Sequence, residues 1–200
     1  MRRLHDFIPT YAPPRGTNSG FNDSAHQFFI ESCGAGVAFS GALHFYAPGA
    51  PAEYDNLESR NASLKTLYPE STGKWLLFAE EIFGNQFGCC GTEYGMFDLE
   101  DGTWSTIAKS FDAFLIAVLG KPNFYTGESL LREWTHTHAP LKMGQQLCPR
   151  LPFIAGGEYS LDNVYPLNWE KNIKLRHSVF EQIKNLPDGT KIEVRTGRHK

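Results

Sequence analysis

The chain has 200 residues, of which 41% are hydrophobic and 20% are charged, and its formal net charge is −3. This length suits one domain with a full hydrophobic core, and the composition is ordinary for globular proteins, which excludes a disordered chain and a fibre. The amino terminus has only an interrupted apolar run, without the features of a secretory signal or a membrane span. We therefore expect a cytoplasmic protein with no membrane partner.

The cysteine content argues against a disulfide-stabilised fold. Four cysteines in a chain of this size do not form a disulfide framework, and a bond between the adjacent Cys89 and Cys90 would be strained. We therefore expect reduced thiols at all four positions, which are Cys33, Cys89, Cys90 and Cys148.

The first elements are an arm, a helix and a strand. Residues 1–20 are rich in proline, glycine and polar side chains, which predicts an arm. The stretch "NDSAHQFFIESCG" predicts a helix, with Ser24 and Gln27 as a capping box and an end near Gly34. "GALHFYAP" alternates as a short strand does, and an irregular acidic connection is expected from there to about Gly73.

An antiparallel meander is expected next. "KWLLFAEE" is a short, nearly continuous apolar run, typical of a buried strand. The runs "QFGCC", "YGMFDL" and "TWSTIA" follow, with Asp101-Gly102 as a strong hairpin signal. "SFDAFLIAVLGKP" then predicts a helix that is capped by Ser110 and ends at Gly120.

The last third is expected to be mixed. "GESLLREWTHTHAP" predicts a short helix, "LPFIAGGEYSLDNVYPL" a glycine turn between two short strands, and "KNIKLRHSVFEQIKNLPDGTKIEVR" a helix, a turn and a final strand. This order of elements predicts an α+β fold with a curved, mainly antiparallel sheet and helices packed on one side. We expect a single domain over 1–200, with the arm over 1–20, a core over 21–120 and a C-terminal extension over 121–200.

The sequence offers no convincing metal site. A structural zinc site needs converging pairs of ligands, whereas Cys89 and Cys90 would point to opposite faces of a strand. His136 and His138 could project together, with Cys148 ten residues on, but no fourth ligand is evident. We expect no metal.

Catalytic and cofactor motifs are also missing. The sequence contains no G-x-S-x-G elbow and no H-E-x-x-H, and "GAGVAF" lacks the third glycine of a dinucleotide fingerprint and follows a helix, as a cap and turn would. Adjacent Glu80 and Glu81 would diverge on a strand. We expect no cofactor and no catalytic residues, although a pairing of Cys90 with His44 in a deep pocket stays open.

The charges are unevenly distributed. Between Ala50 and Thr103 ten acids face three bases, whereas from Lys171 to the end eight bases face three acids. The basic tail lacks interleaved exposed aromatics, so we interpret it as a solvated face and expect no nucleic-acid partner. The acidic stretch could instead be a docking surface for a basic partner, or ordinary turn acids on a soluble domain.

Several segments together resemble a known family. The residues are "HQFFIESCGAG", "GALHFY", "WLLFAEEIFGNQFGCC" and "MFDLEDGTWSTIAKSFDAFLIAVL", over about residues 25–119. They are similar to the SUKH superfamily, which includes the fungal Smi/Knr cell-wall regulators and many bacterial immunity proteins. The tail segments "LPFIAGGEYSLDNVYPLNW" and "QIKNLPDGTKI" are similar to the longer bacterial members.

The resemblance implies a non-catalytic α+β protein that binds and neutralises a cognate toxin protein, encoded by a neighbouring gene, by occluding it. The alternative is a regulatory scaffold of the Smi/Knr type with an endogenous partner. The resemblance does not identify contact residues, so the charge pattern supplies the predicted partner-binding patch. Its members are Glu80, Glu81, Glu93, Tyr94, Asp98, Glu100 and Asp101.

Overall fold

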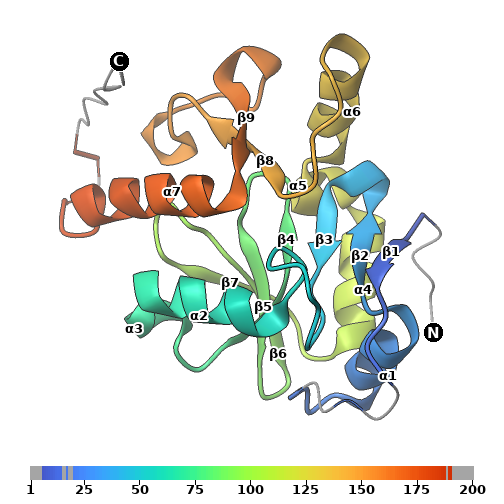
Figure 1. Cartoon of the computed structure of the whole chain (residues 1–200). Helices are drawn as coiled ribbons and strands as arrows, with labels where there is room; N and C mark the ends of the chain where they lie inside the picture. Colours follow the sequence, from blue (N-terminus) through green and yellow to red (C-terminus); the bar gives the residue numbers. More distant parts are fainter. Residues whose placement is uncertain (1–5, 15–16, 18–19, 188, 191–200) are drawn as a thin grey trace.

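The sheet of this protein is an antiparallel meander of seven strands in sequence order (Figure 1). The computed structural model describes residues 6–14, 17, 20–187 and 189–190. The strands are β1 (Ile8–Tyr11), β2 (Ala35–Ala38), β3 (Leu43–Phe45), β4 (Leu76–Glu81), β5 (Gln86–Cys90), β6 (Glu93–Phe97) and β7 (Trp104–Ala108). The predicted strands of the meander are therefore confirmed, and β1 adds a strand inside the expected arm.

Two helices cover one face of the sheet. They are α1 (Ser24–Cys33) and α4 (Phe111–Gly120). Ser110 caps α4 as predicted, but the N-cap of α1 is Asp23 and not Ser24. One carboxylate oxygen of Asp23 accepts hydrogen bonds from the first turn of α1, and the other accepts from the Phe111 amide, so this side chain joins the starts of both helices.

Aromatic rings fill the space between this face and its helices. Phe78 of β4 lies edge-on to Phe114, and His26 of α1 stacks on Phe111 with ring centroids 4.0 Å apart. Burial lowers the pKa of His26 well below its usual value, so the ring packs as a neutral aromatic. We call this cluster the first core. Its largest members include Phe29, Phe45, Phe78, Phe87, Tyr94, Phe111, Phe114 and Trp134.

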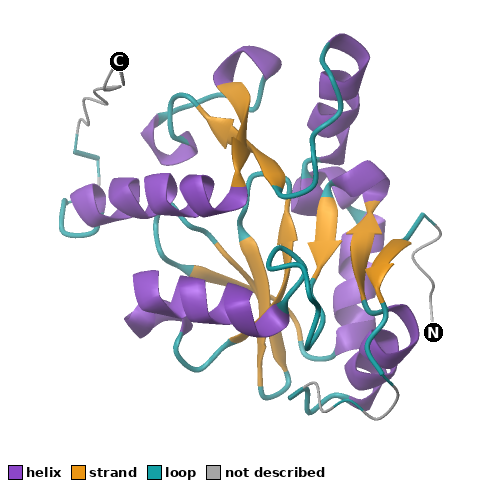
Figure 2. Cartoon of the chain, viewed as in Figure 1, coloured by secondary structure: helices purple, strands orange, loops and turns teal. Residues whose placement is uncertain are grey.

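A second helical layer covers the opposite face (Figures 1 and 2). It consists of α2 (Leu57–Leu67), α3 (Pro69–Thr72) and α7 (Trp169–Ile183). Leu64 of α2 and Ile173 of α7 pack on Leu77 of β4 in a second core. The members of this second core are Leu64, Tyr68, Trp75, Leu77, Phe97, Leu99, Trp169 and Ile173.

The expectation of an irregular connection up to Gly73 was wrong, because α2 lies within it. Asn56 caps α2 by accepting a hydrogen bond from the Ser59 amide. The exposed face of α2 is highly polar, and its buried face includes the unexpected Arg60 and Asn61 beside Leu57 and Leu64. The usual apolar periodicity is therefore weak, since polar side chains occupy buried positions.

The C-terminal region packs on the edge of this framework. It contains α5 (Pro122–Thr126), α6 (Glu128–Thr137) and a separate antiparallel pair, β8 (Gln145–Pro149) and β9 (Val164–Asn168). Short 3-10 turns lie at Phe39–Gly41, Phe153–Ala155 and Leu161–Asn163.

One expectation for the tail needs correction, and a second falls outside the described residues. The glycine-containing segment 151–163 forms 3-10 turns between β8 and β9, so the strand expected before it lies earlier, at Gln145–Pro149. The final strand expected after the Pro-Asp-Gly turn falls on residues outside the described part of the chain. Helix α6 and the tail helix are confirmed, and "GAGVAF" provides the Gly34 cap followed by β2.

The predicted fold class is confirmed: an α+β protein with an antiparallel sheet and helices, α1 and α4, packed on one of its sides. The layer of α2 and α7 on the other side adds to that prediction. Within the described residues, none of the helices combines the length and the apolar character needed to cross a bilayer.

Candidate functional site

Most of the predicted acidic patch is not on the surface. Four of its seven members have side chains that are at most 4% exposed, so they cannot form an open docking surface. They are Glu80, Glu81, Tyr94 and Glu100. This is a correction to the expected patch. Its physical cause is that each of these side chains has an internal partner that offsets its desolvation.

The remaining members do not form one patch either. Glu93 begins β6 and forms an ion pair with Lys109, whereas Asp98 and Asp101 follow the other end of the same strand. Asp101 is exposed and accepts from the amide of Thr103, which closes the hairpin turn. The sequence correctly indicates an acidic turn at residues 98–101 but wrongly connects it to Glu93.

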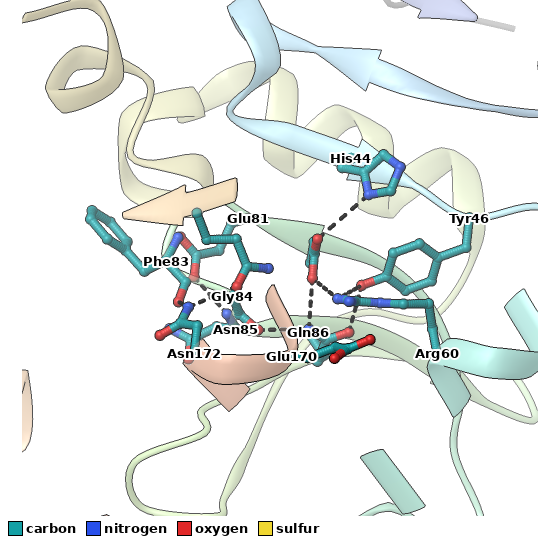
Figure 3. Close-up of polar contacts among 12 residues, drawn as sticks. His44, Tyr46, Arg60, Glu81, Phe83, Gly84, Asn85, Gln86, Glu170 and Asn172 are labelled. Atoms are coloured by element: carbon teal, nitrogen blue, oxygen red, sulfur yellow. Dashed lines mark hydrogen bonds and ion pairs between the residues drawn. The ribbon is translucent and has the colours of Figure 1, made fainter. Parts of the chain in front are cut away.

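A closed polar network lies between the sheet and α2, and Figure 3 labels its members His44, Tyr46, Arg60 and Gln86. Glu80 is at its centre. Its carboxylate pairs with Arg60, and Gln86 donates to it at 3.2 Å. Arg60 Nη2 donates to the Tyr46 hydroxyl at 2.9 Å, and that hydroxyl donates to Gln86 Oε1 at 2.8 Å. Burial alone would raise the pKa of Glu80, but Arg60 and His44 hold it at about 2. The carboxylate is therefore ionised at neutral pH.

His44 extends this network to the loop before α2. Its Nε2 lies 2.7 Å from Asp55 Oδ1, and its ring stacks on Tyr54 with centroids 4.0 Å apart. Trp169 of α7 covers Arg60 from the other side, with the guanidinium carbon 3.9 Å from the ring. The set resembles a catalytic constellation in composition, yet its charged members are 0–3% exposed. The network joins α2 and α7 to the sheet.

A second polar network holds α7 against the turn between β4 and β5. Arg176 donates to the Phe83 carbonyl at 3.0 Å and to Asn85 Oδ1 at 2.9 Å. Asn172 also donates to the Phe83 carbonyl, at 2.8 Å (Figure 3). Arg176 Nε lies 3.5 Å from Glu100 Oε1, so the expectation that this arginine belongs to a solvated basic face was wrong.

Glu81 lies on the inner side of the same turn. Its two carboxylate oxygens accept from the amides of Phe83 and Asn85 at 2.9 and 2.8 Å. Burial raises the pKa of Glu81 to about 8, although these amides and Arg176 act in the opposite direction. At neutral pH this carboxyl is therefore largely protonated.

An open groove of about 480 Å³ lies beside this turn. The turn and the end of β6 form its floor, α5 and α6 form one wall, and the segment before β9 supplies the other. The residues that characterise this groove are Glu81, Phe83, Asp98, Phe124, Glu133 and Tyr159.

The groove exposes aromatic rings beside carboxylates. Phe124 and Tyr159 are 73% and 67% exposed, which is unusual for large aromatic side chains. Asp98 and Glu133 are the carboxylates that remain open to solvent there. Among the described residues that line the groove, none is Lys, Arg or His. Such a surface can bind a partner that presents both apolar area and positive charge.

The structure separates the one cysteine and histidine pairing left open by the sequence. His44 is opposite Glu80, and Glu80 is opposite Gln86, so Cys90 lies four residues further along β5. At about 3.3 Å per residue this is a separation of about 13 Å, too far for a nucleophile and its base. Cys89 is in the first core and Cys90 packs against the second core, so they face opposite sides as expected.

No group of three or more His, Cys, Asp or Glu side chains that could hold a metal ion is found in the described part of the chain. Several titratable groups with shifted pKa values, Glu80 and Arg176 among them, belong to the two buried networks instead. Glu81 and Tyr159 line the groove, and burial raises the pKa of both.

Comparisons with known proteins establish the fold and no family. No protein-family model matches the chain, and no curated protein matches it. The crystal structure of Atu4351 from Agrobacterium tumefaciens is similar, with a TM-score of 0.59 at 13% sequence identity. The similarity covers 86% of this chain and 85% of that one. At this identity the match shows a shared fold over most of both chains and nothing of their activities.

Two of the residues that characterise the groove, Glu81 and Asp98, belong to the predicted partner-binding patch, whereas the residues of its walls do not. Phe124 lies in "KPNFYTG", where a proline and a glycine delimit a single short turn. An aromatic residue in such a short element has little room to be buried, and this is the signal that could have identified it. Tyr159 and Glu133 carry no comparable local signal.

Proposed function

We propose that this chain is an immunity protein, which binds a toxin protein in the cytoplasm and neutralises it by occluding its active site. The observation that carries the proposal is the groove, where exposed Phe124 and Tyr159 adjoin the carboxylates of Asp98 and Glu133. Enrichment in aromatic residues is typical of protein interfaces, and acidic surface charge speeds the capture of a basic partner. The resemblance to the SUKH superfamily supports the same assignment.

The distribution of polar groups favours binding over catalysis. An enzyme needs titratable groups that converge on a space open to substrate. Here His44, Glu80 and Arg60 pair with one another inside the protein, and Arg176 is held by the turn at residues 83–85. The groove adds one protonated carboxyl, Glu81, which is already fixed by two backbone amides.

The test is co-expression with the product of the neighbouring gene. That product alone should arrest growth, and this chain should restore growth and co-purify with it as a complex. The alternative assignment, a Smi/Knr-type regulatory scaffold, predicts a non-toxic neighbour and an endogenous partner. A toxic neighbour that this chain neither binds nor neutralises would overturn the immunity assignment.

A further inference from the structure

The groove has an unbalanced negative charge that a partner can use. Glu133 of α6 is exposed, and no ion pair to its side chain occurs among the described residues. The adjacent Arg132 is paired with Glu128, so it does not neutralise Glu133. The groove therefore offers at least one uncompensated carboxylate at its wall.

Asp98 is a second carboxylate that can accept a further hydrogen bond. Its Oδ1 accepts from the Glu100 amide at 2.7 Å and lies 3.5 Å from Arg176 Nη2. Among the described residues, the hydrogen bond and the ion pair of this carboxylate both involve Oδ1. The Oδ2 atom is thus left for an external donor. Arg176 itself is only 2% exposed and is committed to Asn85 and the Phe83 carbonyl, so it does not fill the groove.

The aromatic walls favour a planar cation. Tyr159 stacks on Phe153 with ring centroids 4.0 Å apart, which fixes its plane, and it is still 67% exposed. Phe124 is held edge-on to Tyr125 and is 73% exposed. A guanidinium stacks on aromatic faces and donates in a fork that matches carboxylates, whereas an ammonium provides only a compact point charge.

We propose that the groove is the recognition site for an arginine side chain of the partner protein. The guanidinium pairs with Asp98 and Glu133, and its stem and plane lie against Tyr159 and Phe124. The volume of about 480 Å³ leaves space for this side chain and the backbone that carries it. The inference rests on the proposed function for the nature of the partner, but the groove chemistry is testable without it.

The direct probe is the peptide acetyl-Gly-Arg-Gly-amide, with the citrulline peptide as its matched neutral control. In ¹⁵N-edited NMR titrations, the arginine peptide should shift the amides of Gly127 and Ser129 in a saturable way, and the citrulline peptide should not. Raising the salt from about 20 to about 200 mM should weaken binding, because the Debye length shrinks by about threefold.

Substitutions of exposed groove residues test the proposal and should leave the fold intact. Glu133→Gln and Phe124→Ala should each weaken arginine-peptide binding by about fivefold, as expected for a lost ion pair or cation–π contact. Asp112→Asn changes an exposed acid on α4, outside the groove, and should leave binding unchanged. Equal binding of both peptides, or no loss in E133Q and F124A, would overturn the proposal.

The two proposals fail in different ways. Suppose that the chain restores growth in the presence of the neighbouring toxin, and that the double variant E133Q/F124A restores growth and binds the toxin equally well. The groove is then excluded as the toxin-binding site, and the immunity assignment stands. If the arginine peptide binds the groove but the chain does not neutralise a toxic neighbour, the immunity assignment fails and the groove stands.

Discussion

Arg60 is a fully buried cation whose charge is balanced by one carboxylate. It is 0% exposed, pairs with Glu80 and is covered by Trp169. Replacing it by methionine keeps most of the volume but leaves Glu80 as an uncompensated buried charge. We expect Arg60→Met to lower the free energy of unfolding by about 3–5 kcal/mol in urea denaturation.

Two further variants distinguish this network from a simple packing effect. Arg132→Met removes an ion pair whose arginine side chain is 64% exposed, and it should cost at most about 1 kcal/mol. The double variant Arg60→Met with Glu80→Gln should recover part of the loss, because no ionised carboxylate is then left without its partner. If R60M unfolds at the same urea concentration as R132M, the network does not fasten α2.

Glu81 predicts a specific dependence of stability on pH. Its pKa is about 8 in the folded protein, against an ordinary value of 4.5, so the folded state holds the proton where the unfolded state has released it. The contribution of Glu81 to the free energy of unfolding is therefore fully present below pH 4.5. It falls as the pH rises toward 8, by about 1.4 kcal/mol per pH unit at most. In Glu81→Gln the part of this slope that comes from Glu81 should be absent.

The measurement is the free energy of unfolding of both proteins at several pH values across that window. The difference between wild type and E81Q cancels other groups, Glu100 among them, whose pKa burial also raises. The Asp112→Asn variant supplies a control and should keep the wild-type slope. Parallel curves for wild type and E81Q would show that Glu81 does not titrate as described.

At the scale of elements, the turn at Gly84 determines how α7 is seated. Gly84 has φ +96°, and a Cβ there would lie 2.8 Å from Gln146 Oε1 and 2.9 Å from Asn172 Nδ2. Gly91 also has a positive φ, +59°, but a Cβ there would meet nothing within 4 Å. The two glycines therefore separate the cost of backbone conformation from the cost of crowding α7.

Gly91→Ala should cost about 1 kcal/mol, which is the conformational penalty alone. Gly84→Ala should cost about 1–3 kcal/mol more, because it also overpacks the contact of α7 with the turn. Hydrogen exchange should show faster exchange of the α7 amides in G84A and unchanged exchange in G91A. Equal stabilities and equal exchange would show that the turn does not control α7.

The meander was predictable because each of its signals is local. Apolar runs, the Asp101-Gly102 turn and the Ser110 cap all depend on a few neighbouring residues, and all correspond to observed elements. Helix α2 was not predictable in the same way. Its buried face includes Arg60 and Asn61, whose partners Glu80 and Leu77 come from another part of the sequence.

The predicted site fails for a related reason. The register between β4 and β5 shifts between Leu77 and Ala79, so Leu77 and Glu80 face the same helical layer although they are three residues apart. Simple alternation would place them on opposite faces. The acidic residues of the predicted patch were expected on the surface because they are charged. Several of them are buried instead, because they pair with Arg60 and Arg176.

At the scale of the whole molecule, one sheet separates two cores. Neighbouring residues of the same strand serve both, since Phe78 belongs to the first core and Leu77 to the second core. A shared central sheet implies that the two helical layers cannot lose their packing independently.

This implication gives a test of cooperativity. Phe114 is 0% exposed in the first core, and Phe114→Ala should cost about 3–5 kcal/mol. In a Trp134→Phe background the remaining tryptophans, Trp75, Trp104 and Trp169, all belong to or pack against the second core. Their fluorescence should therefore report unfolding of the layer that Phe114 does not touch.

If the sheet couples the layers, Phe114→Ala shifts the fluorescence transition and the far-UV circular dichroism transition to the same lower urea concentration. Phe28 on α1 is 57% exposed, and Phe28→Ala should change the free energy of unfolding from either signal by no more than about 0.5 kcal/mol. If the fluorescence transition stays in place while the circular dichroism transition shifts, the second core unfolds as a separate unit and the sheet does not couple the two layers.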